Sequence, residues 1–195
     1  MGSLDVVFPY RRWRVSSEVT PELYGPDFFV GRSETVTRSA SVMVPVLVDL
    51  FHPQSVLDIG CGQGEWLEAF GLVDMAGVDI AAPEGDRYIR QDLRWPLALD
   101  RTYDLVLCLE TGEHLPEASA DTLVASVTRH GRTIVFSAAV PGQEGKGHIN
   151  CQPHEYWHEK FNQRGYAMLD CVRPYIRHPD VSPWYRDNVY AYVAR

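Results

Sequence analysis

The chain has 195 residues, of which 45% are hydrophobic and 23% charged, which is enough for one domain with a sizeable apolar core. Its formal net charge of -8 opposes binding of long RNA or DNA, because that affinity comes mainly from neutralising phosphates. The sequence shows no basic-then-apolar leader, no apolar stretch long enough to span a bilayer, and no C-x-x-C pair among its four cysteines. We therefore expect a cytoplasmic protein with reduced thiols and no membrane partner.

Residues 1–33 combine several prolines with the basic run Arg11-Arg12-Trp13-Arg14 and a group of aromatic residues. This composition predicts an N-terminal arm or lid, in which Tyr24 and Phe28 contact substrate. The alternative is a surface extension whose aromatic residues only cover the core. Residues 34–195 then form the domain proper. Apolar residues over 34–51 recur with a helical period, and Pro45 should kink the helix that they predict.

The next pattern is a strand, a tight turn and the start of a helix. The apolar run at 56–59 leads into Gly60, Gly62 and Gly64, and a helical pattern begins at Glu65. Glycines accept positive φ angles and leave bare main chain against which a ligand can lie, next to the free N–H groups of a helix N-terminus. An ordinary connection between a strand and a helix is the alternative interpretation.

Two further strands end in acidic residues. The apolar run from Met75 leads to Asp79, about 20 residues beyond the first glycine, where dinucleotide-binding folds hold a ribose diol. The short strand that begins at Tyr88 ends at Asp92. Both carboxylates are therefore expected at one edge of the sheet.

The alternation of strands and helices continues along the rest of the chain. Residues 103–109 and 133–137 are continuous apolar runs, as parallel strands buried on both faces require. Helices are expected at 118–130 and 153–163, and closing antiparallel strands at 166–172 and 188–193. We predict an α/β fold: a single Rossmann-like, doubly wound domain with a seven-stranded, mostly parallel sheet and an antiparallel C-terminal strand.

A second group of polar residues follows the strand at 103–109. If the chain turns helically there, Glu110, Glu113 and His114 point the same way, and His148, after the next strand, reaches the same pocket. Two carboxylates and two imidazoles suit Mg²⁺ or Mn²⁺ and can also hold Zn²⁺. One alternative is a site without an ion, in which His114 or His148 is a general base. In the second alternative, Glu113 and His114 only cap a turn and contact the cofactor.

The order Asp58-x-Gly60-x-Gly62-x-Gly64 resembles motif I of the class I S-adenosylmethionine-dependent methyltransferases, and the resemblance runs from about Arg38 to the C-terminus. It implies S-adenosylmethionine as cofactor, with Asp79 on the ribose and Asp92 near the adenine amino group. Arg38 is a candidate partner for the methionine carboxylate, with a solvated surface arginine as the alternative. The expected cofactor contacts are Asp58, Gly60, Gly62, Gly64, Asp79, Ile80, Asp92, Leu93, Leu109 and Arg38.

The E-x-x-E-H motif and the later histidine are similar to the metal-binding set of the small-RNA 3′-terminal 2′-O-methyltransferases, and E-x-x-E-H also resembles ubiquinone-pathway O-methyltransferases. This implies that Glu110, Glu113, His114 and His148 bind a divalent ion that chelates a vicinal diol, with Glu113, His114 and His148 as catalytic residues. The stretch 137–157 resembles bacterial methyltransferases of glycan and polysaccharide pathways, from which it departs at Cys151 and Pro153. Amides and aromatic rings there suit sugar hydroxyls and C–H faces, so substrate contacts are expected from Gln143, Asn150, Gln152, Tyr156 and Trp157.

The sequence therefore predicts an S-adenosylmethionine-dependent O-methyltransferase that acts with Mg²⁺ or Mn²⁺ on a hydroxyl of a saccharide or oligosaccharide, for example a methylated mannoside polysaccharide precursor. The first alternative is a metal-free O- or N-methyltransferase of a small natural product, with a histidine as general base. A cofactor-binding scaffold without catalysis is a second, which the intact acidic and histidine residues oppose. Small-RNA end methylation is a third, which the acidic charge opposes. A homodimer is left open.

Overall fold

The computed structural model describes residues 31–195. Most of the expected arm at 1–33 therefore lies outside the described residues, including Tyr24 and Phe28. None of the helices within 31–195 is long and apolar enough to cross a membrane.

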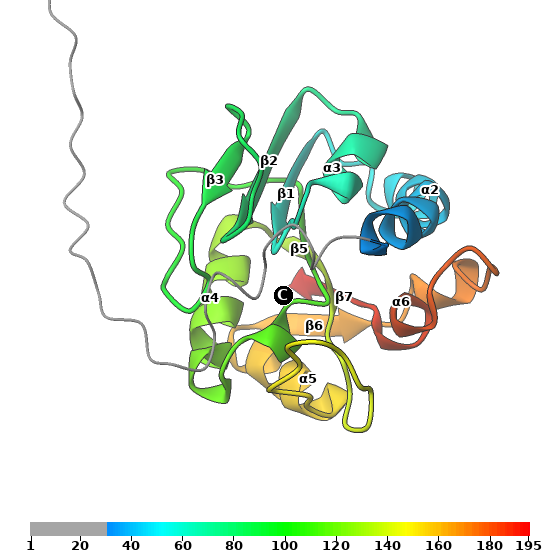
Figure 1. Cartoon of the computed structure of the whole chain (residues 1–195). Coiled ribbons are helices and arrows are strands. Elements are labelled where there is room, and N and C mark those ends of the chain that lie inside the picture. The colour runs from blue at the N-terminus through cyan, green and yellow to red at the C-terminus, as the bar shows by residue number, and fades with distance from the viewer. Residues whose placement is uncertain (1–30) are drawn as a thin grey trace, which may run out of the picture.

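A seven-stranded sheet lies at the centre of the structure, in the order β3-β2-β1-β4-β5-β7-β6 (Figure 1). Strands β1 to β5 pair in parallel, whereas β7 is antiparallel to both β5 and β6. This confirms the predicted α/β fold with a mostly parallel sheet and an antiparallel C-terminal part. The strands are β1 (Ser55–Ile59), β2 (Asp74–Asp79), β3 (Tyr88–Arg90), β4 (Leu105–Leu109), β5 (Thr133–Ser137), β6 (Tyr166–Leu169) and β7 (Tyr190–Ala194).

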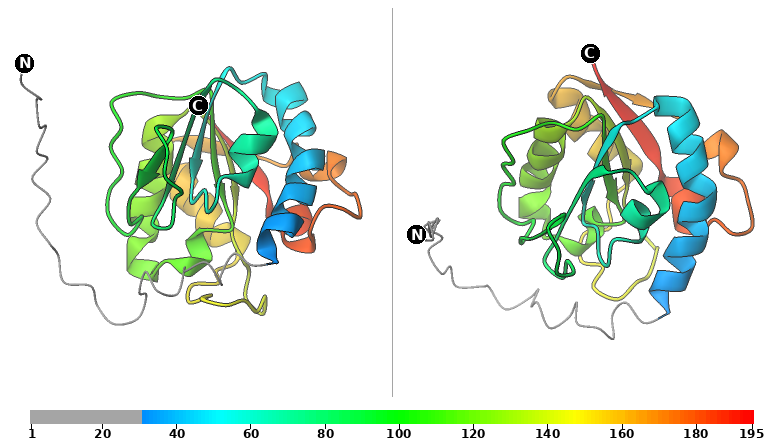
Figure 2. Two further views of the ribbon diagram at one scale, coloured as in Figure 1. Left: turned by 45° about the horizontal axis from the view of Figure 1, so that its top comes forward. Right: turned by 90° about the horizontal axis from the view of Figure 1, so that it is seen from above.

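Helices cover both faces of this sheet (Figure 2). Helices α2 (Arg32–Phe51), α3 (Glu65–Phe70) and α6 (Pro183–Asn188) pack on one face, and α4 (Ala120–His130) and α5 (His154–Gln163) on the other. Helix α2 runs through Pro45, so that proline does not end it. Strand β4 is apolar throughout because both of its faces are buried. Leu105, Leu107 and Leu109 belong to the core cluster on one face of the sheet, and Val106 and Cys108 to the cluster on the other.

The chain after β4 differs from the prediction. Only Gly112–His114 forms a helical turn, the 3₁₀ helix η2, and Glu110 has a left-handed φ of 50°. Glu110, Glu113 and His114 are therefore not successive positions on one helix face. This turn packs closely on α5, because a Cβ atom at Gly112 would lie 2.7 Å from the ring of Trp157, so the position requires glycine. Two other 3₁₀ helices are η3 (Glu117–Ser119) and η4 (Arg173–Tyr175).

Candidate active site

A cavity of about 410 Å³ lies at the carboxyl ends of the parallel strands, next to the point between β1 and β4 where the strand order reverses. In open α/β sheets this is where ligands bind. The lining comes from the loops that follow β1 to β5, together with the first turn of α2 and helix α6. Of the residues predicted as cofactor contacts, the cavity is lined by Gly60, Gly62, Asp79, Ile80, Asp92, Leu93 and Leu109.

Three glycines give the turn after β1 its shape, each with a positive φ: 89° at Gly60, 52° at Gly62 and 91° at Gly64. A Cβ atom on Gly60 would lie 2.0 Å from the hydroxyl oxygen of Thr111, and one on Gly64 would lie 2.3 Å from that of Tyr88. Packing and backbone conformation therefore both require glycine at these two positions. Gly64 serves this packing and does not line the cavity.

The carboxylate of Asp79 is held at the end of β2 by backbone groups. One oxygen accepts a hydrogen bond from the N–H of Gly62 at 3.0 Å, and the other accepts one from the N–H of Ala81 at 2.8 Å. Burial raises the pKa of Asp79 above its usual value, although these two hydrogen bonds act in the opposite direction. Asp79 thus faces the cavity from a fixed position.

A second acid in the cavity, Asp92, is paired with an arginine. Its Oδ2 accepts hydrogen bonds from Nε of Arg94 at 2.9 Å and from Nη2 at 2.6 Å. Arg94 lines the cavity too, and no sequence pattern pointed to it. The two other predicted cofactor contacts lie elsewhere: Asp58 is buried within β1, and Arg38 is exposed on α2 outside the cavity lining.

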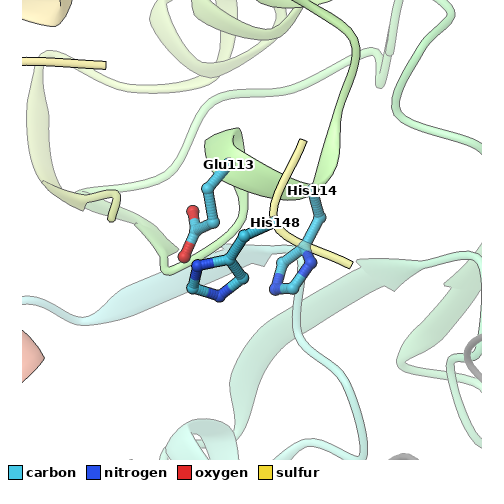
Figure 3. Close-up of side chains that lie close together, drawn as sticks. All are labelled: Glu113, His114 and His148. Atoms are coloured by element: carbon cyan, nitrogen blue, oxygen red, sulfur yellow. The ribbon is translucent and has the colours of Figure 1, made fainter. Parts of the chain in front are cut away.

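Three of the four predicted metal ligands come together in the described structure. One oxygen of Glu113 and one ring nitrogen each of His114 and His148 all lie within 4.8 Å of one another. Figure 3 shows the three side chains directed toward a common space, from η2 and from the loop after β5. Neither carboxylate oxygen of Glu113 makes a hydrogen bond of ordinary geometry to another described residue, although the side chain is fully buried; the carboxyl group of Glu110 and the backbone of Ala139 lie near it.

Backbone carbonyls fix the tautomers of both histidines. Nδ1 of His114 lies 3.1 Å from the carbonyl oxygen of Gly147, and Nδ1 of His148 lies 3.0 Å from that of Gln143. A carbonyl oxygen can only accept a hydrogen bond, so each Nδ1 carries the hydrogen and each Nε2 keeps its lone pair. The same kind of bond orients histidines that ligate metals.

The titration behaviour of this group follows from its burial. Burial raises the pKa of Glu113 well above its usual value, and the neighbouring charge of Glu110 raises it further. Burial lowers the pKa of His114 to about 4, and the nearby His148 contributes to this change. His114 is therefore neutral at pH 7, as a metal ligand or a general base must be.

Glu110, the fourth predicted ligand, lies beside this group but is not one of the three that converge. Its Oε2 accepts a hydrogen bond from Nε2 of Gln143 at 3.3 Å, and its Oε1 has no partner among residues 31–195. Burial raises the pKa of Glu110 to about 7. Glu110 also has the left-handed backbone conformation that is uncommon for a residue other than glycine and is frequent at functional sites.

Only one of the described residues predicted to contact substrate lines the cavity, namely Gln143. The amide of Asn150 is buried and donates to the carbonyl oxygen of Gly112, and Gln152 donates in turn to Asn150. Trp157 is 2% exposed within the core, where Tyr156 packs edge-on against it. These four residues lie outside the cavity lining, because α5 directs Trp157 at the sheet and the preceding loop uses its amides to hold η2.

Several cavity residues were not identified from the sequence. Glu65 and Trp66 begin the helix after the glycine turn, and that position is itself a signal, because the first turn of such a helix faces the ligand. Tyr185 lines the cavity from α6 and packs edge-to-face on Trp66, with ring centroids 5.2 Å apart. Nothing in the local sequence around Tyr185 indicates that position.

Comparisons with known proteins agree with this architecture. No curated protein sequence matches the chain. The structure is similar to the sugar N-methyltransferase KedS8 from a Streptoalloteichus species, with 19% identity and a TM-score of 0.64 over 97% of this chain and 98% of that one. DesVI from Streptomyces venezuelae gives 15% identity and a TM-score of 0.62 over 92% of this chain and all of the other (100%). Magnesium protoporphyrin IX methyltransferase from Synechocystis was solved with S-adenosylmethionine bound. It gives 20% identity and a TM-score of 0.57 over 88% of this chain and 84% of that one.

At such low identities these structures establish the fold. The family model described as "Methyltransferase domain" matches residues 35–139, which is more than half of the chain and includes the glycine turn, Asp79 and the Glu113–His114 pair. The chain therefore belongs to the class I S-adenosylmethionine-dependent methyltransferases, and it is an enzyme of that family.

Proposed function

We propose that this methyltransferase transfers the methyl group of S-adenosylmethionine to a hydroxyl of a saccharide or oligosaccharide, and that Glu113, His114 and His148 hold Mg²⁺ or Mn²⁺ beside that hydroxyl. One observation carries the proposal. A fully buried carboxylate that makes no hydrogen bond of ordinary geometry to another described residue lies beside two imidazoles whose Nδ1–H groups are already engaged. An unpaired buried carboxylate is costly unless a cation or a proton compensates it.

The residues around the glycine turn fit the methyl donor. We propose that Asp79 binds the ribose diol, since its backbone partners fix the carboxylate while the remaining lone pairs face the cavity. Asp92, with Leu93, is assigned to the adenine end, and the bare main chain of Gly60 and Gly62 to the methionine part. Ile80 and Leu109 supply apolar walls. We do not assign the exposed Arg38 to this site.

The acceptor hydroxyl has to lose its proton when the new C–O bond forms and the bond from sulfur to the methyl carbon breaks. A divalent ion at such a site lowers the pKa of a hydroxyl and fixes its position. In this proposal Glu113, His114 and His148 would hold that ion and orient the acceptor, and the buried Glu110, with its pKa of about 7, would accept the proton. Gln143 offers an amide at the cavity wall for an acceptor hydroxyl.

A second candidate is O- or N-methylation of a small natural product without an ion. It is favoured by the hydrogen bond that places the hydrogen of His114 on Nδ1, and by the pKa of about 4, which keeps this ring neutral at pH 7. The similar structure of a sugar N-methyltransferase makes an amino sugar the natural acceptor to test. In this case His114 accepts the proton directly.

Titration calorimetry separates the two candidates. Mn²⁺ is titrated into chelator-stripped protein saturated with S-adenosylhomocysteine, and the titration is repeated with Glu113→Gln and with the control Glu117→Gln, which changes an exposed glutamate of η3. We expect binding by the wild type and the control, and loss of binding in Glu113→Gln. If the wild type binds no Mn²⁺, or if Glu113→Gln binds it equally well, the metal site is refuted.

The acceptor is tested by mass spectrometry of products from hydroxylated sugars and from amino sugars, each with and without a chelator. A methyl ether that forms only without chelator supports the first candidate, and a chelator-insensitive methylamine supports the second. The acidic cavity residues Glu65, Asp79, Asp92 and Glu110 favour a small neutral or cationic acceptor over a nucleic acid. The four free cysteines support our proposal that the enzyme works in the cytoplasm.

A further inference from the structure

A chain of side-chain hydrogen bonds leads from His154, the first residue of α5, to Glu110 in the cavity lining. Nε2 of His154 lies 3.2 Å from Oδ1 of Asn188, Nδ2 of Asn188 lies 2.8 Å from Oε1 of Gln143, and Nε2 of Gln143 lies 3.3 Å from Oε2 of Glu110. The four residues come from four different segments of the fold, and Asn188 ends helix α6. Asn188 is 3% exposed and does not line the cavity.

The bonds of this hydrogen-bond chain all run in one direction. Gln143 donates through Nε2 to the carboxyl group of Glu110 and accepts at Oε1 from Nδ2 of Asn188. Asn188 then has only its carbonyl oxygen left for His154, which donates through Nε2. Nδ1 of His154 is then the acceptor nitrogen of the ring, and the hydroxyl of Tyr190, 3.5 Å away, can donate to it. Every donor thus points toward the cavity.

Gln143 connects this chain to the proposed metal ligands. Its side chain donates to Glu110, and its backbone carbonyl accepts the Nδ1–H of His148 at 3.0 Å. Gln143 belongs to the loop after β5, which also supplies the carbonyl of Gly147 that orients His114. A side chain that fixes Gln143 therefore acts on both a carboxylate and an imidazole of the site.

We infer that Asn188 is a positioning residue of this methyltransferase. It holds Gln143 so that the side-chain amide of Gln143 donates to Glu110 and the backbone carbonyl of Gln143 orients His148. The inference rests on the proposed function, because it assigns Asn188 to the metal and acceptor end of the same cavity. Mutation of residues that orient metal ligands in this indirect way typically lowers metal affinity 10- to 100-fold. None of these hydrogen bonds reaches Asp79 or Asp92 in the described structure, so we expect cofactor affinity to stay unchanged.

The test compares Asn188→Ala, Gln143→Ala and the double variant in the full chain. For each, Mn²⁺ affinity is measured by calorimetry with S-adenosylhomocysteine bound. In the variants that keep Gln143, and in the wild type, the side-chain amide resonances of Gln143 are also followed by NMR in metal-free protein. Asn188→Asp is a second variant of similar size, which keeps the acceptor for His154 and removes the donor to Gln143. Asn162→Ala is the control, since it removes an exposed bond to Arg195.

We expect Asn188→Ala to weaken Mn²⁺ binding roughly 10-fold and to shift the Gln143 amide resonances. The double variant should bind Mn²⁺ no more weakly than Gln143→Ala, because Asn188 acts through that side chain. Asn188→Asp should shift the same resonances, and Asn162→Ala should leave both readouts unchanged. Unmoved resonances, or additive losses of Mn²⁺ affinity in the double variant, overturn the inference.

If the wild type binds no Mn²⁺, the metal site of the proposed function is refuted, but the positioning role of Asn188 is not. The amide resonances then decide the inference about Asn188, because they are recorded without metal. A wild type that binds Mn²⁺, together with an Asn188→Ala variant that binds it equally well, refutes the positioning role and leaves the proposed function standing.

Discussion

Replacing Gly145 with alanine is expected to displace the imidazole of His148 without straining the backbone. A Cβ atom at position 145 would lie 2.2 Å from Nε2 of His148, 2.4 Å from Cε1 and 2.5 Å from Cδ2, whereas ordinary contact begins at 3.4 Å. The ring must therefore move by about 1.2 Å, the difference between 3.4 and 2.2 Å. Gly145 is not among the glycines with a positive φ, so an alanine fits its backbone conformation.

A displacement of about 1 Å at a reacting centre costs on the order of 100-fold in rate, and the loss of an oriented metal ligand costs a similar factor in affinity. We expect Gly145→Ala to lower kcat by roughly this factor and to weaken Mn²⁺ binding, with unchanged affinity for S-adenosylhomocysteine. Gly165→Ala is the control for backbone strain alone: Gly165 has a φ of 81°, a Cβ atom there would have no other atom within 4 Å, and the residue lies outside the cavity lining. Wild-type turnover and Mn²⁺ affinity in Gly145→Ala would refute the role of His148.

Three further predictions concern single groups of the site. Asp79→Ala should raise the Kd of S-adenosylhomocysteine roughly 10- to 100-fold, because hydrogen bonds to a charged group contribute about 1.5–3 kcal/mol; unchanged affinity in calorimetry removes Asp79 from the site. His148→Ala should lower kcat and leave that Kd unchanged, and a wild-type rate contradicts both its metal and its base role. Because the pKa of His114 falls from 6.5 to about 4 on folding, the unfolded chain binds more protons between these values, so stability is lost as pH falls from 6.5 to 4. Urea unfolding should show a smaller loss over this range in His114→Gln than in the wild type, and an equal loss contradicts the assignment.

The fold could be predicted because its main signals are local. Glycines at 60, 62 and 64 mark the turn after β1, and the apolar runs of β4 and β5 mark strands covered on both faces. The same logic placed Asp79 and Asp92 at the cavity, because strands paired in parallel end at the same edge.

The site was harder to predict because it depends on how short loops turn. His148 was correctly placed near Glu113, but Glu110 was assigned to a helix that does not exist, since its own left-handed backbone separates it from η2. Amide and aromatic residues in a loop look alike in sequence whether they bind substrate or support the loop. Asn150 and Trp157 proved to be supports, and only the packing of η2 against α5 reveals this.

The position of β7 between β5 and β6 has a consequence for how the protein is made. Strand β6 pairs only with β7 in the described sheet, and β7 follows it in the chain. During synthesis β6 therefore emerges from the ribosome before the strand that joins it to the sheet exists, and one edge of β5 stays open for the same period. The earlier parallel strands can pair as they appear, but Asn188, two residues before β7, reaches Gln143 only when this last strand docks. The wall of the cavity at Gln143 is therefore completed only after the parallel part of the sheet.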